Sequence, residues 1–243
     1  MPAHLWRSRS STGWRTTSAP SEPTHRPSAP AAWQCCAASA GYDYAAYRSV
    51  ARLSTPLLDE PLRRVSGFAN FSRPWFITAG FLALFGGPHD RRAALTGLAA
   101  VGVMSLVVNQ PMKLIGERRR PNRDALGVPQ QRWVTMPSST SFPSGHSASA
   151  AAFAVAVGDL LPALKLPLRG AASIVAFSRV YTGVHYPSDV LVGASVSALL
   201  GRVVAATVQR RARGAPARRP QPESPMPETG ATEAMGETTD IPL

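Results

Sequence analysis

The chain has 243 residues, of which 44% are hydrophobic and 16% charged, with a formal net charge of +12 and two adjacent cysteines, Cys35 and Cys36. This length allows one domain with flanking tails, and two neighbouring cysteines exclude a disulfide framework. The positive charge would permit nucleic-acid binding, but the sequence contains no zinc-finger spacing, RNA-binding signature or basic helical stripe. We therefore expect no nucleic-acid partner, and anionic lipid headgroups or phosphorylated substrates instead.

The N-terminal part of the chain divides into a tail and an amphipathic segment. Residues 1–43 are rich in Ser, Pro, Thr and Arg and contain no apolar run long enough for a signal-peptide core, so we expect a disordered tail. The alternatives are an organellar-type targeting segment, which the composition alone suggests, and an artefact of an upstream start codon. Between Tyr44 and Ser72, apolar residues recur at helical spacing among six charged residues. Because six charges are costly in a lipid-exposed span, this pattern predicts one or two amphipathic helices at a membrane surface, the second beginning at Pro61.

Five apolar, Ala-rich blocks follow, and each is short or moderate in hydrophobicity. We expect an all-α, membrane-embedded helical bundle of about five spans, in which small residues allow close helix packing. A soluble all-helical bundle is the structural alternative. The acidic, Pro-rich residues 212–243 predict a second disordered tail. The expected spans are residues 75–85, 93–113, 144–161, 168–184 and 188–208.

Three polar clusters interrupt these blocks. They read K-LIGERR-RP from Lys113, FPSGH from Phe142 to His146, and SR-VYTGV-H-YPS-D from Ser178 to Asp189. They fall at the end of the second block, the start of the third, the end of the fourth and the start of the fifth. In an antiparallel bundle these ends share one face, so the clusters should meet there.

The residue types in these clusters suit a phosphate ester. Its transition state spreads negative charge over the equatorial oxygens, which fixed cations stabilise. Arg120 and Arg179 can each bind two oxygens in fork geometry, and Lys113 adds a point charge. Backbone N–H groups at Ser144, Gly145 and His146 would point at the same oxygens if a helix begins there.

Two histidines extend this cradle to catalysis. His185 lies four residues before Asp189, so the carboxylate can accept one ring N–H and leave the other nitrogen free to attack phosphorus. His146 could then give a proton to the leaving alkoxide and later take one from the hydrolytic water. This two-step mechanism needs neither a metal nor a cofactor, and we expect none.

Each cluster also has a structural explanation when it is taken alone. An Arg-rich run is usually a solvated loop, and PSGH is usually a turn that begins a helix. The joint occurrence of the three clusters favours a functional site. Four further arginines keep the solvated-loop interpretation, or at most attract anions generally: Arg118, Arg119, Arg123 and Arg132.

The three clusters match K-x6-RP, PSGH and SR-x5-H-x3-D, and the sequence therefore resembles the type 2 phosphatidic acid phosphatase superfamily, in its membrane lipid phosphate phosphatase branch. The resemblance covers about residues 75–211, within an expected domain of residues 44–211. It implies nucleophilic attack by His185, proton transfer by His146 and orientation of the nucleophile by Asp189. It implies phosphate binding by Lys113, Arg120, Ser144, Gly145 and Arg179.

The expected function is metal-independent hydrolysis of a membrane lipid phosphate or diphosphate, of phosphatidate or polyprenyl type, through a phosphohistidine intermediate. Two alternatives remain: a vanadium-dependent haloperoxidase-like oxidoreductase, because that branch of the superfamily shares the cradle, and a non-catalytic phospholipid-binding membrane protein. Most other Arg and Lys residues of the bundle lie at the opposite face. The positive-inside rule therefore predicts an integral protein of a bacterial-type cell membrane with an extracytoplasmic active site.

Overall fold

The computed structural model describes residues 31–115 and 118–214, and all regular secondary structure within those ranges is helical. The all-α class is therefore confirmed, and it follows from long runs of Ala and Leu, which are strong helix formers. The α-helices are α1 (Ala31–Ala51), α2 (Pro56–Phe68), α3 (Arg73–Phe85), α4 (Pro88–Met104), α5 (Gln110–Ile115), α6 (Gly145–Leu160), α7 (Lys165–Tyr181) and α8 (Pro187–Gly214). Shorter helical turns are η1 (Asn70–Ser72), η2 (Ser105–Asn109), η3 (Gln130–Arg132) and η4 (Pro162–Leu164).

Prolines begin several of these helices. Pro56, Pro88 and Pro187 are the first residues of α2, α4 and α8, where the missing N–H would have no intrahelical partner in any case. Pro61 instead lies inside α2. The prediction that Pro61 begins the second amphipathic helix was therefore wrong, because Pro56 already supplies the start.

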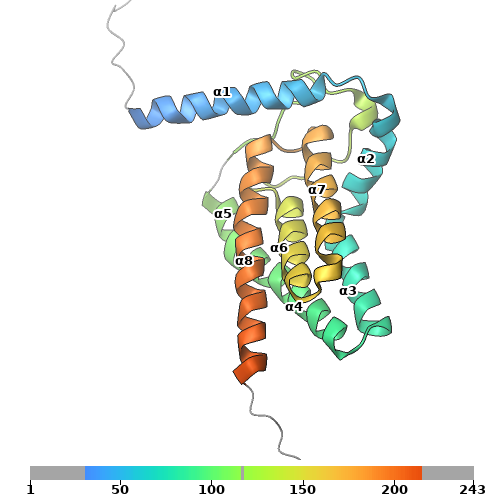
Figure 1. The fold of residues 1–243 in the computed structure, drawn as a ribbon. Coiled ribbons are helices and arrows are strands. Elements are labelled where there is room, and N and C mark those ends of the chain that lie inside the picture. Colours follow the sequence, from blue (N-terminus) through green and yellow to red (C-terminus); the bar gives the residue numbers. More distant parts are fainter. Residues whose placement is uncertain (1–30, 116–117, 215–243) are drawn as a thin grey trace, which may run out of the picture.

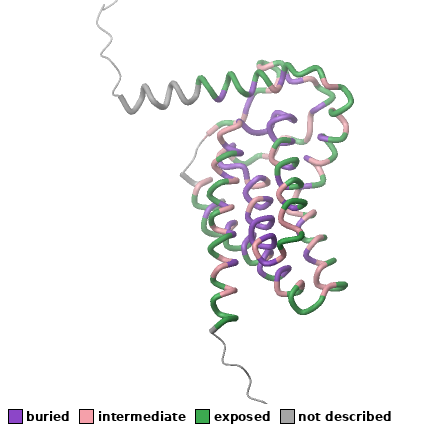
Figure 2. Tube along the Cα trace, viewed as in Figure 1, coloured by how far each residue is buried: buried purple, intermediate pink, exposed green. Residues whose placement is uncertain are grey.

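Helix α6 occupies the centre of the bundle (Figures 1 and 2) and packs against α4, α7 and α8. All of its alanines except Ala151 are buried, so its neighbours approach its backbone closely. Two glycines of α8 permit this approach. A Cβ at Gly201 would lie 2.5 Å from the carbonyl oxygen of Ala152, and one at Gly193 would lie 2.9 Å from that of Ser144. The start of α8 is thereby held against the start of α6.

The bundle places four helix ends together, as the sequence predicted. The end of α5, the start of α6, the end of α7 and the start of α8 lie at one end of the molecule, and α1 runs across that end (Figure 1). The three polar clusters therefore share one face.

Two segments within the described residues are long and apolar enough to cross a membrane: Pro88–Lys113, which joins α4 to α5, and Pro187–Arg213 in α8. Helices α3, α6 and α7 have 13, 16 and 17 residues, fewer than the roughly 20 of a typical span. The number of five spans remains a prediction. Many large apolar side chains are exposed on the outside of the bundle, an arrangement that suits lipid better than water. They include Phe76, Ile77, Phe81, Leu84, Phe85, Leu95, Leu106, Leu191 and Leu199.

The N-terminal helix differs from the sequence prediction. Helix α1 begins at Ala31, so residues 31–43, which we expected in a disordered tail, are helical. Asp43 is only 7% exposed and forms hydrogen bonds with Arg118 and Ser188, so it is not part of a disordered tail. The remaining parts of the two expected tails, residues 1–30 and 215–243, lie outside the described residues. Helix α8 continues to Gly214, slightly past the predicted domain boundary at Arg211.

Candidate active site

Lys113 and Arg120, the two cations of the first cluster, meet at one serine. Lys113 Nζ lies 3.2 Å from Ser139 Oγ, and Arg120 Nη2 donates to the same oxygen at 3.2 Å. Arg120 also donates from Nε to the Ser139 carbonyl at 2.8 Å, which fixes the plane of its guanidinium. Burial lowers the pKa of Arg120, but an arginine remains protonated at neutral pH.

Arg120 reaches across to the third cluster. Its Nη1 lies 3.1 Å from Nε2 of His185 and donates to the Val184 carbonyl at 2.9 Å. The first and third clusters are therefore in direct contact. The nitrogen expected to attack phosphorus faces a guanidinium that was expected to bind phosphate.

His185 lies in the turn between α7 and α8 and is 2% exposed. The turn is tight, because the N–H groups of Val184 and His185 both donate to the Arg179 carbonyl, at 3.1 and 3.2 Å. Gly183 supplies the positive φ of 72° that this turn needs. Burial, reinforced by the neighbouring Arg120 and Arg179 and opposed by Asp189, lowers the pKa of His185 to about 4. Its imidazole is therefore neutral at pH 7, as a nucleophile requires.

Asp189 is fully buried and faces His185. The distance from His185 Nδ1 to Asp189 Oδ2 is 3.5 Å, so the pair is in electrostatic contact without a short hydrogen bond. The same Oδ2 accepts a hydrogen bond from Ser141 Oγ and one from the Tyr186 N–H at 2.9 Å. The other carboxylate oxygen, Oδ1, accepts from Arg118 Nη1 at 2.8 Å.

This last contact corrects the interpretation of Arg118. The sequence placed it in a solvated loop, whereas its guanidinium bridges Asp189 and Asp43. Burial lowers the pKa of Arg118, but hydrogen bonds and charge interactions with the two carboxylates outweigh burial, and the net shift is upward.

The second cluster begins α6 at Gly145, as predicted, and Ser144 precedes it in extended backbone. The N–H of Ser144 donates to the Asp189 carbonyl at 3.0 Å, and its hydroxyl lies 3.0 Å from Ser147 Oγ. The prediction that the Ser144 N–H points at phosphate is therefore wrong in this structure. The N–H groups of Gly145 and His146 remain candidates, because the first turn of a helix leaves its donors free.

His146 has a partner that no sequence motif indicates. Its Nε2 lies 2.8 Å from Oδ1 of Asn70, in the turn η1 between α2 and α3. Two residues of that turn, Phe71 and Ser72, have positive φ values of 56° and 58°. This backbone conformation is strained for residues other than glycine. Such strain is common where a turn must present one side chain to a functional site.

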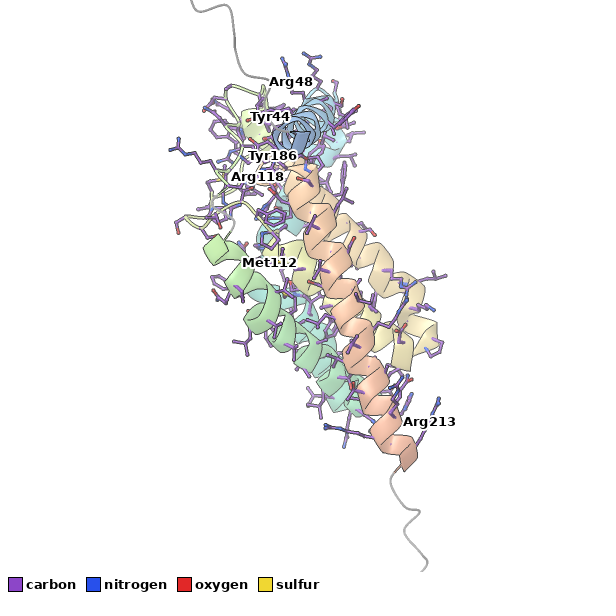
Figure 3. The ribbon with its side chains drawn as sticks, turned by 90° about the vertical axis from the view of Figure 1, so that its left-hand side faces the viewer. Tyr44, Arg48, Met112, Arg118, Tyr186 and Arg213 are labelled. Atoms are coloured by element: carbon purple, nitrogen blue, oxygen red, sulfur yellow. The ribbon has the colours of Figure 1, made fainter. Side chains whose placement is uncertain are left out.

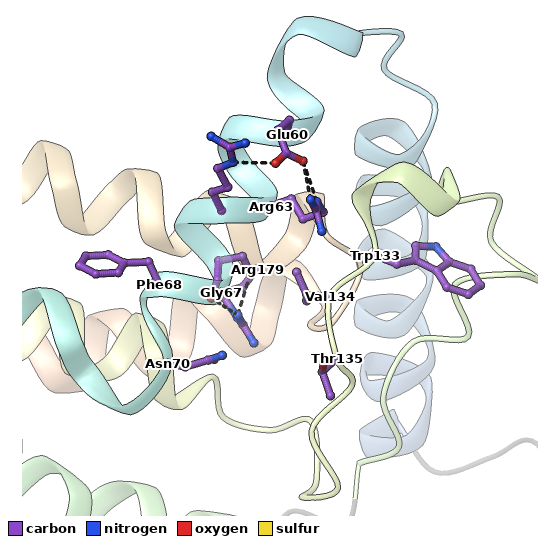
Figure 4. Close-up of a pocket in the computed structure, with 11 residues that line it drawn as sticks. Glu60, Arg63, Gly67, Phe68, Asn70, Trp133, Val134, Thr135 and Arg179 are labelled. Atoms are coloured by element: carbon purple, nitrogen blue, oxygen red, sulfur yellow. Dashed lines mark hydrogen bonds and ion pairs between the residues drawn. The ribbon is translucent and has the colours of Figure 1, made fainter.

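Arg179 lies at the floor of a polar cavity of about 480 Å³ (Figure 4). Its Nη1 donates to the carbonyl and hydroxyl oxygens of Ser66, at 3.0 and 2.7 Å, and its Nε has no hydrogen-bond partner among the described residues. Across the cavity, Arg63 and Arg64 both bond Glu60. The cavity thus carries excess positive charge beside the third cluster.

A second cavity, of about 200 Å³, contains residues from the first and second clusters. Its polar side chains are those of Lys113, His146 and three serines, Ser72, Ser105 and Ser149. Its remaining walls are mostly apolar and come from η1 and α4, including Phe71, Val101 and Met104. A ligand in this cavity would therefore contact a cation, a histidine and hydrocarbon.

Two of the remaining arginines are also structural. Arg132 is buried, and it donates from Nε to Asp59 at 2.7 Å and from Nη2 to the Leu53 carbonyl, which ties its loop to α1 and α2. Arg123 stacks on Trp133, with 4.6 Å from its Cζ to the ring centre. The solvated-loop interpretation was therefore wrong for both, and of the four it suits only the exposed Arg119.

Within residues 31–115 and 118–214, no three His, Cys, Asp or Glu side chains are grouped as a metal site would need. The chemistry available from the described side chains of the three clusters is that of cations, two imidazoles and the buried carboxylate of Asp189. These groups can bind an anion, attack it and move protons.

Comparison with known proteins places the chain in a family. Residues 93–213 match the PAP2 superfamily profile. A decaprenylphosphoryl-5-phosphoribose phosphatase of Mycobacterium tuberculosis is 34% identical over 163 residues, which cover 63% of this chain and 84% of that protein. The chain belongs to the PAP2 superfamily. The resemblance drawn from the three motifs is thus confirmed, and the chain is a phosphatase of this superfamily.

Other PAP2 relatives agree with this assignment. An undecaprenyl-diphosphatase of Bacillus subtilis is 29% identical over 118 residues, which cover 49% of this chain and 59% of that protein. The crystal structure of a transmembrane PAP2 type phosphatidylglycerolphosphate phosphatase from Bacillus subtilis has a TM-score of 0.57 and 26% identity, covering 71% of this chain and 87% of that one. The phosphatidylglycerolphosphate phosphatase therefore shares the helical fold of this chain, and it is a transmembrane protein.

Proposed function

We propose that this PAP2 phosphatase hydrolyses a terminal phosphate of a membrane lipid through a phosphohistidine at His185. The observation that supports this best is the cavity that joins Lys113 and His146 to the apolar residues Val101 and Met104. A phosphate held by Lys113 would leave its lipid-linked alcohol beside His146. The apolar wall would then receive the part of the leaving group that leads to the hydrocarbon chain.

In the first step, Lys113, Arg120 and Arg179 hold the phosphate oxygens, and Nε2 of His185 attacks phosphorus. Arg120 Nη1 now lies 3.1 Å from that nitrogen, so the incoming phosphate takes over this guanidinium contact. A nitrogen–phosphorus bond forms as the bond from phosphorus to the lipid oxygen breaks. His146 gives its proton to the departing alkoxide.

In the second step, water attacks the phosphorus of the phosphohistidine. His146, now neutral, takes a proton from this water, and the nitrogen–phosphorus bond breaks. Inorganic phosphate leaves and His185 returns to its neutral form. Asp189 holds the imidazole and stabilises the charge that it acquires during the cycle.

We propose a polyprenyl-linked phosphate as the substrate class. The support is the Mycobacterium tuberculosis relative, because this chain matches 84% of its length. The name of that relative describes a phosphorylated sugar carried on decaprenyl phosphate. Polyprenyl diphosphates and phosphatidate-type lipids are the next classes, and the undecaprenyl-diphosphatase relative supports the former.

We further propose that the chain is an integral membrane protein with its active site on the extracytoplasmic face. The end of the bundle opposite the site carries cations on several helices, and the positive-inside rule places such residues in the cytoplasm. They include Arg91, Arg92, Lys165, Arg169, Arg210 and Arg211.

The test is phosphate release by detergent-purified protein in EDTA, with phosphorylated polyprenyl-linked ribose, undecaprenyl diphosphate and phosphatidate as substrates. His185→Ala should abolish release from every lipid. His146→Gln should slow both steps, because His146 is the acid in the first and the base in the second. In the unchanged protein, an alkaline quench during turnover should trap label from the terminal phosphate on the protein in an alkali-stable, acid-labile form. His89→Gln, which changes a histidine bonded to the Leu160 carbonyl, is the matched control and should stay active. Release that persists in His185→Ala would refute the mechanism, and lipid binding without release would favour a non-catalytic protein.

A further inference from the structure

Helix α1 is bonded directly to the turn that carries His185. Asp43 accepts hydrogen bonds from the Ser188 N–H at 2.9 Å and the Ser188 hydroxyl at 2.6 Å. One helical turn further along α1, the Tyr47 hydroxyl donates to the Gly183 carbonyl at 3.1 Å. The two contacts flank His185 in sequence. Both ends of the nucleophile's turn are therefore held by the same helix.

A second connection runs through the first cluster. Arg118 donates from Nη1 to Asp189 at 2.8 Å and from Nη2 to Asp43, so one planar guanidinium spans both carboxylates. Its Cζ lies 4.0 Å from the ring centre of Tyr186, which supports it from one side. Figure 3 shows Arg118 and Tyr186 beneath the end of α1, with Tyr44 above them.

Asp43 and Asp189 are connected through the guanidinium of Arg118. Ser141 and the Tyr186 N–H both bond Oδ2, whereas in the described part of the chain Arg118 is the group that bonds Oδ1. The guanidinium fork is rigid, so holding one nitrogen at Asp43 sets the position of the other at Asp189. Both carboxylates are buried, so neither is stabilised by water if Arg118 moves away.

We propose that Asp43 is a positioning residue for the reaction, which acts through Arg118 and Ser188 to hold Asp189, and hence His185, in the orientation for attack. This inference rests on the proposed role of His185 as the nucleophile. It assigns a role in the reaction to α1, although α1 lies outside residues 93–213, the region that matches the family profile.

The first test is Asp43→Asn in the full chain, with the lipid substrate on which the unchanged protein is most active. Asparagine keeps the size and one acceptor for Ser188 but loses the charge that holds Arg118. We expect kcat to fall about 10- to 100-fold, the range seen when a group that orients a reacting side chain is lost. KM and competitive inhibition by inorganic phosphate should change less than about 3-fold, because Asp43 does not touch the phosphate-binding cations.

Arg118 variants test the route of the effect. Arg118→Gln should lower kcat by a similar factor. The double variant Asp43→Asn with Arg118→Gln should be no worse than Arg118→Gln alone, because Asp43→Asn keeps an acceptor for Ser188 and loses only the charge that acts through Arg118. Arg118→Lys keeps a charge at this partly exposed position but cannot span two carboxylates, so it should also lose kcat. Full activity of Arg118→Lys, or multiplied losses in the double variant, would overturn the proposal.

Asp59→Asn is the matched control. It removes another carboxylate near α1, which accepts from Arg132 at 2.7 Å but has no contact with Asp189. We expect a lower Tm in detergent with kcat within about 3-fold of the unchanged protein, since no reacting group loses its support. An equal kcat loss in Asp59→Asn would mean that any loosening of the N-terminal region suffices, and would overturn the specific role of Asp43.

The outcomes separate this inference from the proposed function. Activity that survives His185→Ala removes the phosphohistidine mechanism itself. Loss of activity in His185→Ala together with a fully active Asp43→Asn leaves that mechanism in place and removes only the role of α1. If Asp43→Asn does not fold, Arg118→Lys decides the question alone, by kcat and phosphate inhibition in protein with an unchanged Tm.

Discussion

The depressed pKa of His185 predicts that the enzyme keeps its activity in mild acid. With a pKa of about 4, about nine-tenths of His185 is neutral at pH 5, whereas an ordinary histidine with a pKa near 6.5 would be neutral in about 3% of molecules. The burial that lowers this pKa therefore preserves roughly 30-fold more of the nucleophile at pH 5. We expect the acid limb of kcat/KM that belongs to His185 to fall near pH 4.

The assay is kcat/KM from pH 3.5 to 8, which reports ionisations of the free enzyme and the free substrate. The second ionisation of a phosphate monoester also falls near pH 6, so it is measured separately by phosphorus NMR and divided out. His89→Gln shows whether another histidine contributes. A corrected acid limb near pH 6.5 would refute the reasoning, because it would mean that His185 is solvated or paired as an ordinary histidine.

The same shift has a thermodynamic consequence. The pKa of His185 is lower in the folded protein than in the unfolded chain, so between about pH 6.5 and 4 the unfolded state binds more protons. The contribution of His185 to stability is therefore complete above pH 6.5 and is lost as the pH falls toward 4. The Tm in detergent should drop across this window, and less so in His185→Gln.

Three further predictions concern single contacts. Asn70→Ala removes the 2.8 Å partner of His146 and should lower kcat about 10-fold with little change in KM, whereas Asn70→Asp should lose less. Arg120→Lys removes the guanidinium fork and should lower kcat/KM by about 10²- to 10³-fold in steady-state assays. Gly201→Ala should lower the Tm, because its Cβ would meet the α6 backbone at 2.5 Å, whereas Gly102→Ala, with open space around it, should keep or raise the Tm. A Gly201→Ala protein as stable as Gly102→Ala would contradict the close packing of α8 on α6.

The contacts that the sequence missed share one property. Asp43 and Arg118 are 75 residues apart, and Arg118 and Asp189 are 71 apart. No periodicity or spacing rule relates residues at such separations, so Arg118 was indistinguishable from its neighbour Arg119 in the same run. The strained turn that brings Asn70 to His146 was equally invisible, because left-handed backbone at Phe71 and Ser72 is imposed by packing and runs against their local preference.

The sequence by itself determined the helical class, the family and the identity of the chemical groups. Apolar blocks set the helices, and residues at fixed spacing within short segments set the three motifs, both of which are local properties of a chain. Because the motifs stand at block ends, even their meeting at one face could be predicted. Only the tertiary structure decided that α1 is bonded to the turn that carries His185, that Arg118 joins Asp43 to Asp189, and that the Ser144 N–H is already bonded. Those outcomes depend on how a helix crosses the end of the bundle, and crossing geometry is set by the packing of side chains far apart in the chain.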